Sequence, residues 1–305
     1  MTGFHYIFVK TLAVIAVGFL LKQAKVLSAE HGKYLSRIIL NVTLPAVILK
    51  TISSITLDFS LAMAPAICLI YSAGMAILSG VIFGKAPSHE KGIGRMASVG
   101  FNIGFFGYPV ISGLFGLAGL SVVAMFDLGN AFAVFGISYL LGYLYSEKRA
   151  GKKIDYKSIV ALFATSVPFM CYLAAIVMNL SGVHISGLPL DVLDILAQAN
   201  TGMALIVLGL MLDFRFDASH WKLILKVLSL RFIVGLTAGL LLYRFLPFSH
   251  LYRSVILLGL LLPTGIAIIP YAVEFRYDAR VAGTIANFTM IISFLLLWFF
   301  MFVIG

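Results

Sequence analysis

The chain has 305 residues, of which 61% are hydrophobic and only 11% are charged. A soluble domain carries about 25% charged residues, so this composition excludes an ordinary soluble globular protein and indicates an all-α polytopic membrane protein in a single membrane domain, residues 1–305. The formal charge of +10 does not indicate a nucleic-acid partner, because membrane proteins carry Lys and Arg in their loops for topology.

In chain order, the apolar residues form ten blocks, each long enough to cross a hydrocarbon core about 30 Å thick. The N-terminal block lacks a basic n-region and a small-residue cleavage site, so we interpret it as a retained helix and not as a signal peptide. The ten expected spans are 4–24, 33–55, 60–84, 93–117, 118–144, 158–181, 189–214, 220–246, 251–275 and 278–304.

Basic residues between the blocks predict the orientation. Sixteen Lys and Arg lie in the odd-numbered loops, whereas the even-numbered loops hold only Arg244 and Arg253. Because cytoplasmic loops carry the excess of Lys and Arg, we expect both termini to be extracytoplasmic, in a protein of the cell membrane. The sixteen are Lys22, Lys25, Lys33, Lys85, Lys91, Arg95, Lys148, Arg149, Lys152, Lys153, Lys157, Arg215, Lys222, Lys226, Arg276 and Arg280.

The longest linker, residues 145–157, divides the spans into two sets of five, 1–144 and 158–304. Five is an odd number, so two homologous halves must lie in opposite orientations across the membrane. Pro109 aligns with Pro270 at an offset of 161 residues, and the same offset aligns Gly104 with Gly265. Equal or similar offsets align Asn102 with Pro263, Asn41 with Asn200, and Asn130 with Asn287.

Two of the spans carry residues that interrupt helices. The fourth contains "FNIGFFGYPVISG" from Phe101, and the ninth contains "LPTGIAIIPYA" from Leu262. Pro removes a helical hydrogen bond and Gly adds backbone freedom, so these patterns predict unwinding over 102–109 and 263–270. Matched breaks in inverted halves indicate a transporter binding site near the bilayer midplane, where the two spans cross. The alternative is that Gly and Pro merely kink the two helices.

The chemistry of such a site follows from the helix ends. Each half-helix that restarts after a break presents free N–H groups and a partial charge of about +0.5, which favours a carboxylate ligand. Pro suits the first position of such a restart, and the side chains of Asn102 and Thr264 are available to bond the same ligand. The candidate substrate-binding residues in the breaks are Asn102, Gly104, Gly107, Pro109, Pro263, Thr264, Gly265 and Pro270.

Other polar residues lie deep in the expected spans. Asp127 is near mid-depth in span five, where a charge is costly and therefore a functional candidate. Its candidate roles are proton carrier, cation ligand, or ion-pair partner of Arg231 at similar depth in span eight, so both are candidates for ion coupling. The amides of Asn41, Asn130 and Asn287 are explained equally well by substrate contact and by interhelical hydrogen bonds.

The sequence contains no signal of catalysis. It lacks a zinc-protease motif, a nucleophile elbow and a phosphate-binding loop, and the two cysteines, Cys68 and Cys171, have no metal-ligand spacing. We therefore expect no enzymatic activity, no cofactor and no bound metal.

Three stretches resemble the auxin efflux carrier family: "LSRIILNVTLPAVIL", "GFNIGFFGYPVISGLFG" and "LLPTGIAIIPYAVEFRYDARVAGTIANFT", in that order. The resemblance implies an inverted five-plus-five repeat, similar in architecture to bile-acid sodium symporters and sodium/proton antiporters. It further implies a scaffold of spans one, two, six and seven, a moving transport domain, and a homodimer. Substrates of the family include auxin, malate and malonate, all of them carboxylates.

This chain departs from the pattern in two places. The ninth-span break has Pro263, Thr264 and Gly265 without the acidic or amide group that a sodium symporter would use, and the tenth span has Asn287 where small hydroxyl residues are more usual. The first departure argues against sodium coupling. The short central linker also lacks the long hydrophilic insert of many plant carriers, so a bacterial-type member is the better match.

The sequence as a whole predicts a secondary or facilitative carrier of small organic anions in the lipid bilayer. The substrate would bind where spans four and nine cross, an elevator-like motion would give alternating access, and Asp127 would couple transport to a proton. Two alternatives stay open: a cation/proton antiporter in which Asp127 is the ion ligand, and a membrane receptor on the same fold that does not transport.

Overall fold

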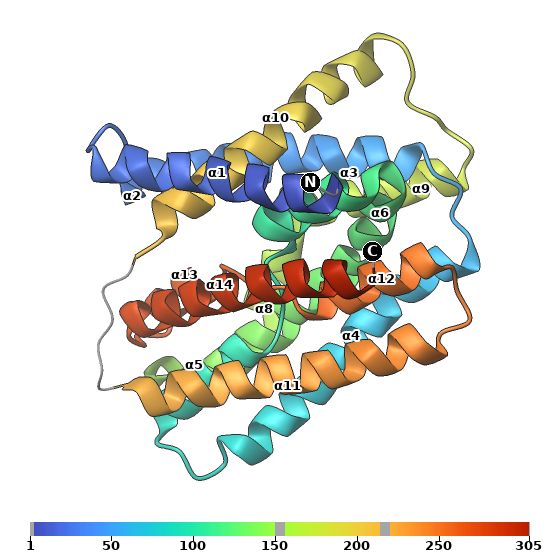
Figure 1. Ribbon diagram of the computed structural model, residues 1–305. Coiled ribbons are helices and arrows are strands. Elements are labelled where there is room, and N and C mark those ends of the chain that lie inside the picture. Colours follow the sequence, from blue (N-terminus) through green and yellow to red (C-terminus); the bar gives the residue numbers. More distant parts are fainter. Residues whose placement is uncertain (1–2, 150–155, 214–219, 305) are drawn as a thin grey trace.

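The computed structural model describes residues 3–149, 156–213 and 220–304, and these are built almost entirely of helix. The expected linker 145–157 lies partly outside the described residues, as do Lys152, Lys153 and Arg215 of the topology count. Figure 1 shows most of the helices running roughly along a common axis, with α10 at the edge of the bundle.

Helices of the first half occupy residues 3–149. They are α1 (Gly3–Gln23), α2 (Ala29–Ile38), the π-helical η1 (Ile39–Thr43), α3 (Leu44–Ser53), α4 (Phe59–Ile82), α5 (Ser88–Ser98), the π-helical η2 (Ile103–Gly107), α6 (Tyr108–Ala131), the π-helical η3 (Phe132–Ser138), α7 (Tyr139–Leu144) and the 3-10 turn η4 (Glu147–Arg149).

Helices of the second half occupy residues 156–304. They are α8 (Tyr156–Thr165), α9 (Val167–Leu180), α10 (Leu188–Met211), α11 (Trp221–Phe245), α12 (His250–Leu260), α13 (Ile268–Glu274) and α14 (Ala279–Ile304).

The number of helices able to span a bilayer differs from the ten expected. Seven segments of the described chain are long and apolar enough, or eight if α8 and α9, bent by 67°, count as one span. The expected spans four and nine are absent from this set because each is divided into shorter helices. One continuous segment, Ile103–Leu144, also joins the second part of span four to span five.

Local chemistry explains where this long segment and others bend. Gly116 has φ 60° and ψ −148°, outside the helical region, and it lies at the expected boundary between spans four and five. Such a positive φ is open to Gly at little cost. Between α8 and α9, the Ser166 side chain accepts the N–H of Phe169 and caps the new helix.

Asp58 caps the start of α4 in the same way. The N–H of Leu61 and the hydroxyl of Ser60 donate to its carboxylate and lower the pKa of Asp58.

Helices pack both between the two halves and within each half. Helix α1 packs along α10, and α3 packs along α9; α4 packs on α6, and α11 on α12. The α1–α10 crossing depends on two glycines, because a Cβ at Gly18 would collide with the backbone of Ile206 and one at Gly209 with the backbone of Ile15. These contacts bring the backbones of α1 and α10 together as small residues do in membrane helix pairs.

The two ends of the chain lie together (Figure 1). The indole N–H of Trp298, near the end of α14, bonds Nδ1 of His5 at 2.8 Å, and its ring stacks on Phe8 at 5.6 Å. The start of α1 and the end of α14 are therefore at the same end of the bundle.

Candidate functional site

Two helix interruptions meet near the centre of the molecule. The first interruption is residues 99–102, between α5 and η2, and the second is residues 261–267, between α12 and α13. Phe101 and Thr264 form an antiparallel bridge, and the N–H of Asn102 donates to the carbonyl of Pro263 at 2.9 Å. The two segments that the sequence expected to break are therefore side by side.

The first interruption lies earlier than expected. Helix resumes at Ile103 and continues through Gly107 into α6, so the predicted unwinding over 102–109 is wrong for all but its first residue. The chain turns at Gly100 instead, which has φ 80°. Pro109 lies within the resumed helix, and Gly107 packs under Leu262, whose Cδ1 would be 3.0 Å from an added Cβ. The second interruption overlaps the expected range 263–270, although helix returns at Ile268.

The amide of Asn130, on α6, holds the first interruption in place. Its Oδ1 accepts the N–H of Phe101 at 2.8 Å, and its Nδ2 donates to the carbonyl of Phe101 at 3.0 Å. The same Nδ2 donates to Oδ1 of Asp127 at 2.9 Å. Both backbone groups of Phe101 are thus paired with one side chain, which satisfies them inside a protein interior.

Thr264 holds the second interruption in place, as Asn130 holds the first. Its N–H donates to Oγ1 of Thr289 at 3.2 Å, and its own hydroxyl donates to the carbonyl of Ala97 at 2.8 Å. Thr264 is buried, with 1% of its surface exposed. The hydroxyl that the sequence made available to a ligand donates to a backbone carbonyl in this structure.

Arg231, on α11, joins the two interruptions. Its Nη1 donates to the carbonyls of Ala97, Ser98 and Gly100 at 3.2, 3.1 and 2.9 Å, and its Nη2 donates to that of Leu262 at 3.1 Å. The guanidinium also lies 5.2 Å from the centre of the Phe101 ring. An Arg231–Asp127 ion pair, one of the alternatives left open by the sequence, is not among those found in residues 3–149, 156–213 and 220–304.

Asp127 instead belongs to a buried cluster of hydroxyl and amide groups. Its Oδ2 accepts the hydroxyl of Tyr172, on α9, at 2.8 Å, and the hydroxyls of Tyr172 and Tyr108 are in hydrogen-bond contact. Asn130 donates to the other carboxylate oxygen. The cluster therefore links Asp127 and Tyr108, both on α6, to a helix of the second half.

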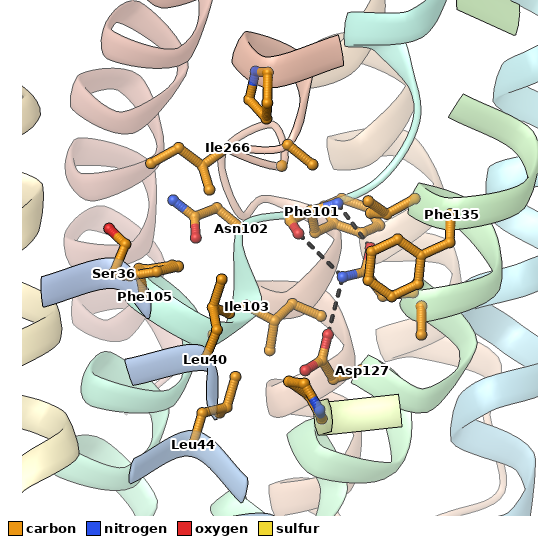
Figure 2. Close-up of a pocket in the computed structure, with 18 of the residues that line it drawn as sticks. Ser36, Leu40, Leu44, Phe101, Asn102, Ile103, Phe105, Asp127, Phe135 and Ile266 are labelled. Carbon is orange, nitrogen blue, oxygen red and sulfur yellow. Dashed lines mark hydrogen bonds between the residues drawn. The ribbon is translucent and has the colours of Figure 1, made fainter. Parts of the chain in front are cut away.

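A cavity of about 610 Å³ adjoins both interruptions (Figure 2). Six of the expected site residues line it: Asn102, Gly104, Asp127, Asn130, Gly265 and Pro270. The other walls are mostly apolar, including Phe101, Phe105, Phe135 and Ile266. Figure 2 shows Asn102 at the level of Ser36, and Asp127 farther along the cavity toward Leu44.

The remaining expected site residues do not line the cavity. Asn41 is exposed and donates to the carbonyl of Arg37 in its own helix, while Asn287 donates to the carbonyl of Asp213. Pro263 and Thr264 belong to the second interruption, Gly107 and Arg231 contact it, and Pro109 lies within α6. Within the described part of the chain, no group of three or more His, Cys, Asp or Glu side chains is placed to hold a metal ion.

Sequence reasoning missed several lining residues. Tyr172 lies on the helix expected as span six, where nothing in the local sequence distinguishes it from other membrane tyrosines. Lys33 and Ser36 belong to α2, close to the α1–α2 turn, and they mark one end of the cavity. Val273, close to the α13–α14 turn, lines it too. The cavity therefore extends from the interruptions toward the end of the bundle that carries these two turns.

The family of the chain is shown by comparison with known proteins. A family model described as a membrane transport protein matches residues 6–159 and 156–301, which together cover almost the whole chain. The chain belongs to this family, the auxin efflux carrier family of its sequence motifs. An uncharacterized transporter of Methanocaldococcus jannaschii is 28% identical over 298 residues, covering 94% of each chain. One of Methanothermobacter thermautotrophicus is 26% identical over 287 residues, covering 92% of each.

Proposed function

We propose that the protein is a secondary active or facilitative transporter of small organic anions, such as mono- or dicarboxylates. The observation that carries this proposal is the cavity of about 610 Å³ where the two helix interruptions meet. A concave and mostly apolar site with a few converging polar groups is the usual form of a small-molecule site. In a family of membrane transport proteins, such a site between paired interruptions is the expected place for a substrate.

The polarity of the cavity favours an anion with an organic body. Ile103, Gly104 and Phe105 line it, and as the first residues of a resumed helix their N–H groups lack intrahelical acceptors. The partial positive charge of about +0.5 at this end would attract a carboxylate. The amide of Asn102 and the ammonium of Lys33 add donors, while Phe105, Phe135 and Ile266 would cover the apolar part of the substrate.

The paired interruptions also support the inverted five-plus-five repeat with ten crossings. Asn102 bonds Pro263, and these are the residues that the offset of 161 places in register. Two equivalent residues that are hydrogen-bonded beside an antiparallel bridge are what a two-fold axis in the membrane plane would produce. The repeat makes span six equivalent to span one, and span seven equivalent to span two. The packing of α1 on α10 joins spans one and seven, and the packing of α9 on α3 joins the equivalent spans six and two.

The proposed orientation gives the direction in which the cavity opens. Lys22 lies in the last turn of α1 and Lys25 in the loop between α1 and α2, and the positive-inside rule assigns this end to the cytoplasm. The cavity extends to this end, so we assign the structure to an inward-facing state with both termini extracytoplasmic. Alternating access by an elevator-like motion would require α6 to slide against α9, which breaks the Tyr172–Asp127 hydrogen bond.

The coupling ion in this proposal is a proton carried by Asp127. A carboxylate in the cavity would repel a bound anion unless it were protonated, so the proton and the anion bind together more readily than either alone.

The direct test of the proposed function is uptake of radiolabelled mono- and dicarboxylates into proteoliposomes containing the purified protein. We expect uptake of at least one acid. Gly265→Leu, in the cavity wall, should reduce this uptake, whereas Gly202→Leu, outside the cavity, should not. Absence of flux for every acid in the panel would refute the proposal.

A second candidate function has one observation in its favour. Asp127 lines the cavity and accepts hydrogen bonds from Tyr172 and Asn130 without a cationic partner among the ion pairs of the described residues. A cation/proton antiporter would use such a carboxylate as its ion ligand. Cation-dependent proton flux in the same proteoliposomes, lost in Asp127→Asn, would select this function over anion transport.

A further inference from the structure

The carbonyl groups around Arg231 form a compact cage contributed by both helix interruptions. Three of them, from Ala97, Ser98 and Gly100, belong to the end of α5 and the turn that follows it. The fourth, from Leu262, belongs to the turn after α12. All four lie within 3.2 Å of a guanidinium nitrogen, on a side chain that is only 4% exposed.

The electrostatics of the cage require a cation. The last carbonyls of a helix have no intrahelical donor, and a helix C-terminus carries about −0.5 elementary charge. Two such ends, those of α5 and α12, meet here and sum to about one negative charge. One guanidinium supplies the matching positive charge and the donors.

We propose that Arg231 is a built-in counter-ion that locks the two interruptions together, in the position where a bound metal cation would otherwise be needed. The protein therefore holds its helix crossing without sodium or potassium. This inference concerns the cation requirement of the fold, and its test measures stability, so it stands or fails separately from the proposed anion transport.

The surroundings of the cage select a guanidinium over an ammonium. The guanidinium lies over the Phe101 ring, and Tyr71 stacks on Phe101 at 5.7 Å. A planar cation both stacks on a ring and donates in several fixed directions, whereas an ammonium is a compact point charge with three donors. Lys at position 231 would thus supply the charge but leave part of the cage unpaired.

The experiment is thermal unfolding of the purified protein in detergent, with Arg231→Ala, Arg231→Lys and Arg244→Ala as variants. Arg244 is the matched control, because it is on the same helix but exposed at its end. We expect Arg231→Ala to lower Tm by about 10 °C, because it removes the charge and the guanidinium donors from a buried set of carbonyls. Low-millimolar guanidinium chloride should restore at least half of this loss, whereas choline chloride at the same ionic strength should restore none. Wild type and Arg244→Ala should show no such gain.

Two results would overturn the inference. One is a folded Arg231→Ala protein whose Tm shows no gain in guanidinium beyond that of the wild type. The other is an Asp127→Asn protein, which lacks the cation ligand of the second candidate function, whose Tm still depends on sodium or potassium when either replaces choline, because the cage would then hold a metal in spite of Arg231. If Arg231→Ala does not fold, Arg231→Lys decides the matter: intermediate stability, raised by guanidinium, supports the counter-ion, and a Tm equal to that of the wild type contradicts it.

Discussion

The side-chain amide of Asn130 pairs with both backbone groups of Phe101, at 2.8 and 3.0 Å, as a neighbouring strand would. A backbone that leaves its helix inside a membrane protein must find new hydrogen-bond partners, and one side chain supplies two of them here. The same amide donates to Asp127, so the geometry of the first interruption and the position of the carboxylate are set together.

Asn130→Ala should therefore destabilise the protein strongly. Removing the amide leaves the N–H and C=O of Phe101 buried without partners, at a cost of about 3 kcal/mol in unfolding free energy. Thermal unfolding in detergent measures the change. Asn41→Ala is the matched control, since Asn41 is exposed and bonds only its own helix. Equal Tm values for the two variants would show that Asn130 does not hold the interruption.

Asp127→Asn should separate transport from its coupling. The amide keeps the size of the carboxylate and still accepts the hydroxyl of Tyr172, so the variant should fold and bind substrate. It carries no proton, so uptake into proteoliposomes should lose the stimulation by an acidic outer medium that the wild type shows, while substrate exchange continues. Asp194→Asn, outside the cavity and paired with Lys50, is the control. Persistent stimulation in Asp127→Asn would remove Asp127 from the coupling mechanism.

The sequence predicted that the two interruptions exist and that they meet, but it placed the first too late. Pro109 suggested the break, yet it lies where the π-helical η2 passes into α6, and the helix that resumes at Ile103 continues through it. The turn occurs at Gly100, whose φ of 80° is unfavourable for other residues, and where an added Cβ would lie 2.7 Å from Val134. Gly100 and Asn102 mark the position of the first interruption more closely than Pro109 does.

Which of the mid-span amides face the cavity could not be predicted from the sequence. Asn41, Asn130 and Asn287 lie at similar depths in their spans, yet only Asn130 lines the cavity. A membrane helix is apolar on nearly all sides, so its sequence carries little information about which face points inward. Tyr172 was missed for a related reason, because its contact with Asp127 joins residues 45 positions apart and depends on how α6 and α9 pack.

The direction of the cavity can be tested by cysteine labelling. In a Cys171→Ala background, where the remaining native cysteine, Cys68, is fully buried, Ser36→Cys should react with a membrane-impermeant maleimide from the cytoplasmic face only. Thr56→Cys, exposed at the opposite end of the same span, should react only from outside. Inside-out and right-side-out vesicles give the two comparisons. The reverse pattern would contradict the proposed orientation.

The hydroxyl of Tyr172 should hold the protein in the inward-facing state. It donates to Asp127 from the helix that our proposal assigns to the scaffold, so the bond must break when α6 moves. Such a bond to a charged group contributes about 2 kcal/mol, equivalent to a shift of about 30-fold in a two-state equilibrium. Tyr172→Phe should therefore slow labelling of Ser36→Cys from the cytoplasmic face by up to this factor. Tyr34→Phe removes an exposed hydroxyl and should leave the rate unchanged. Equal labelling rates in Tyr172→Phe and the wild type would show that this hydrogen bond forms in both states or in neither, and the tyrosine would then have no part in alternating access.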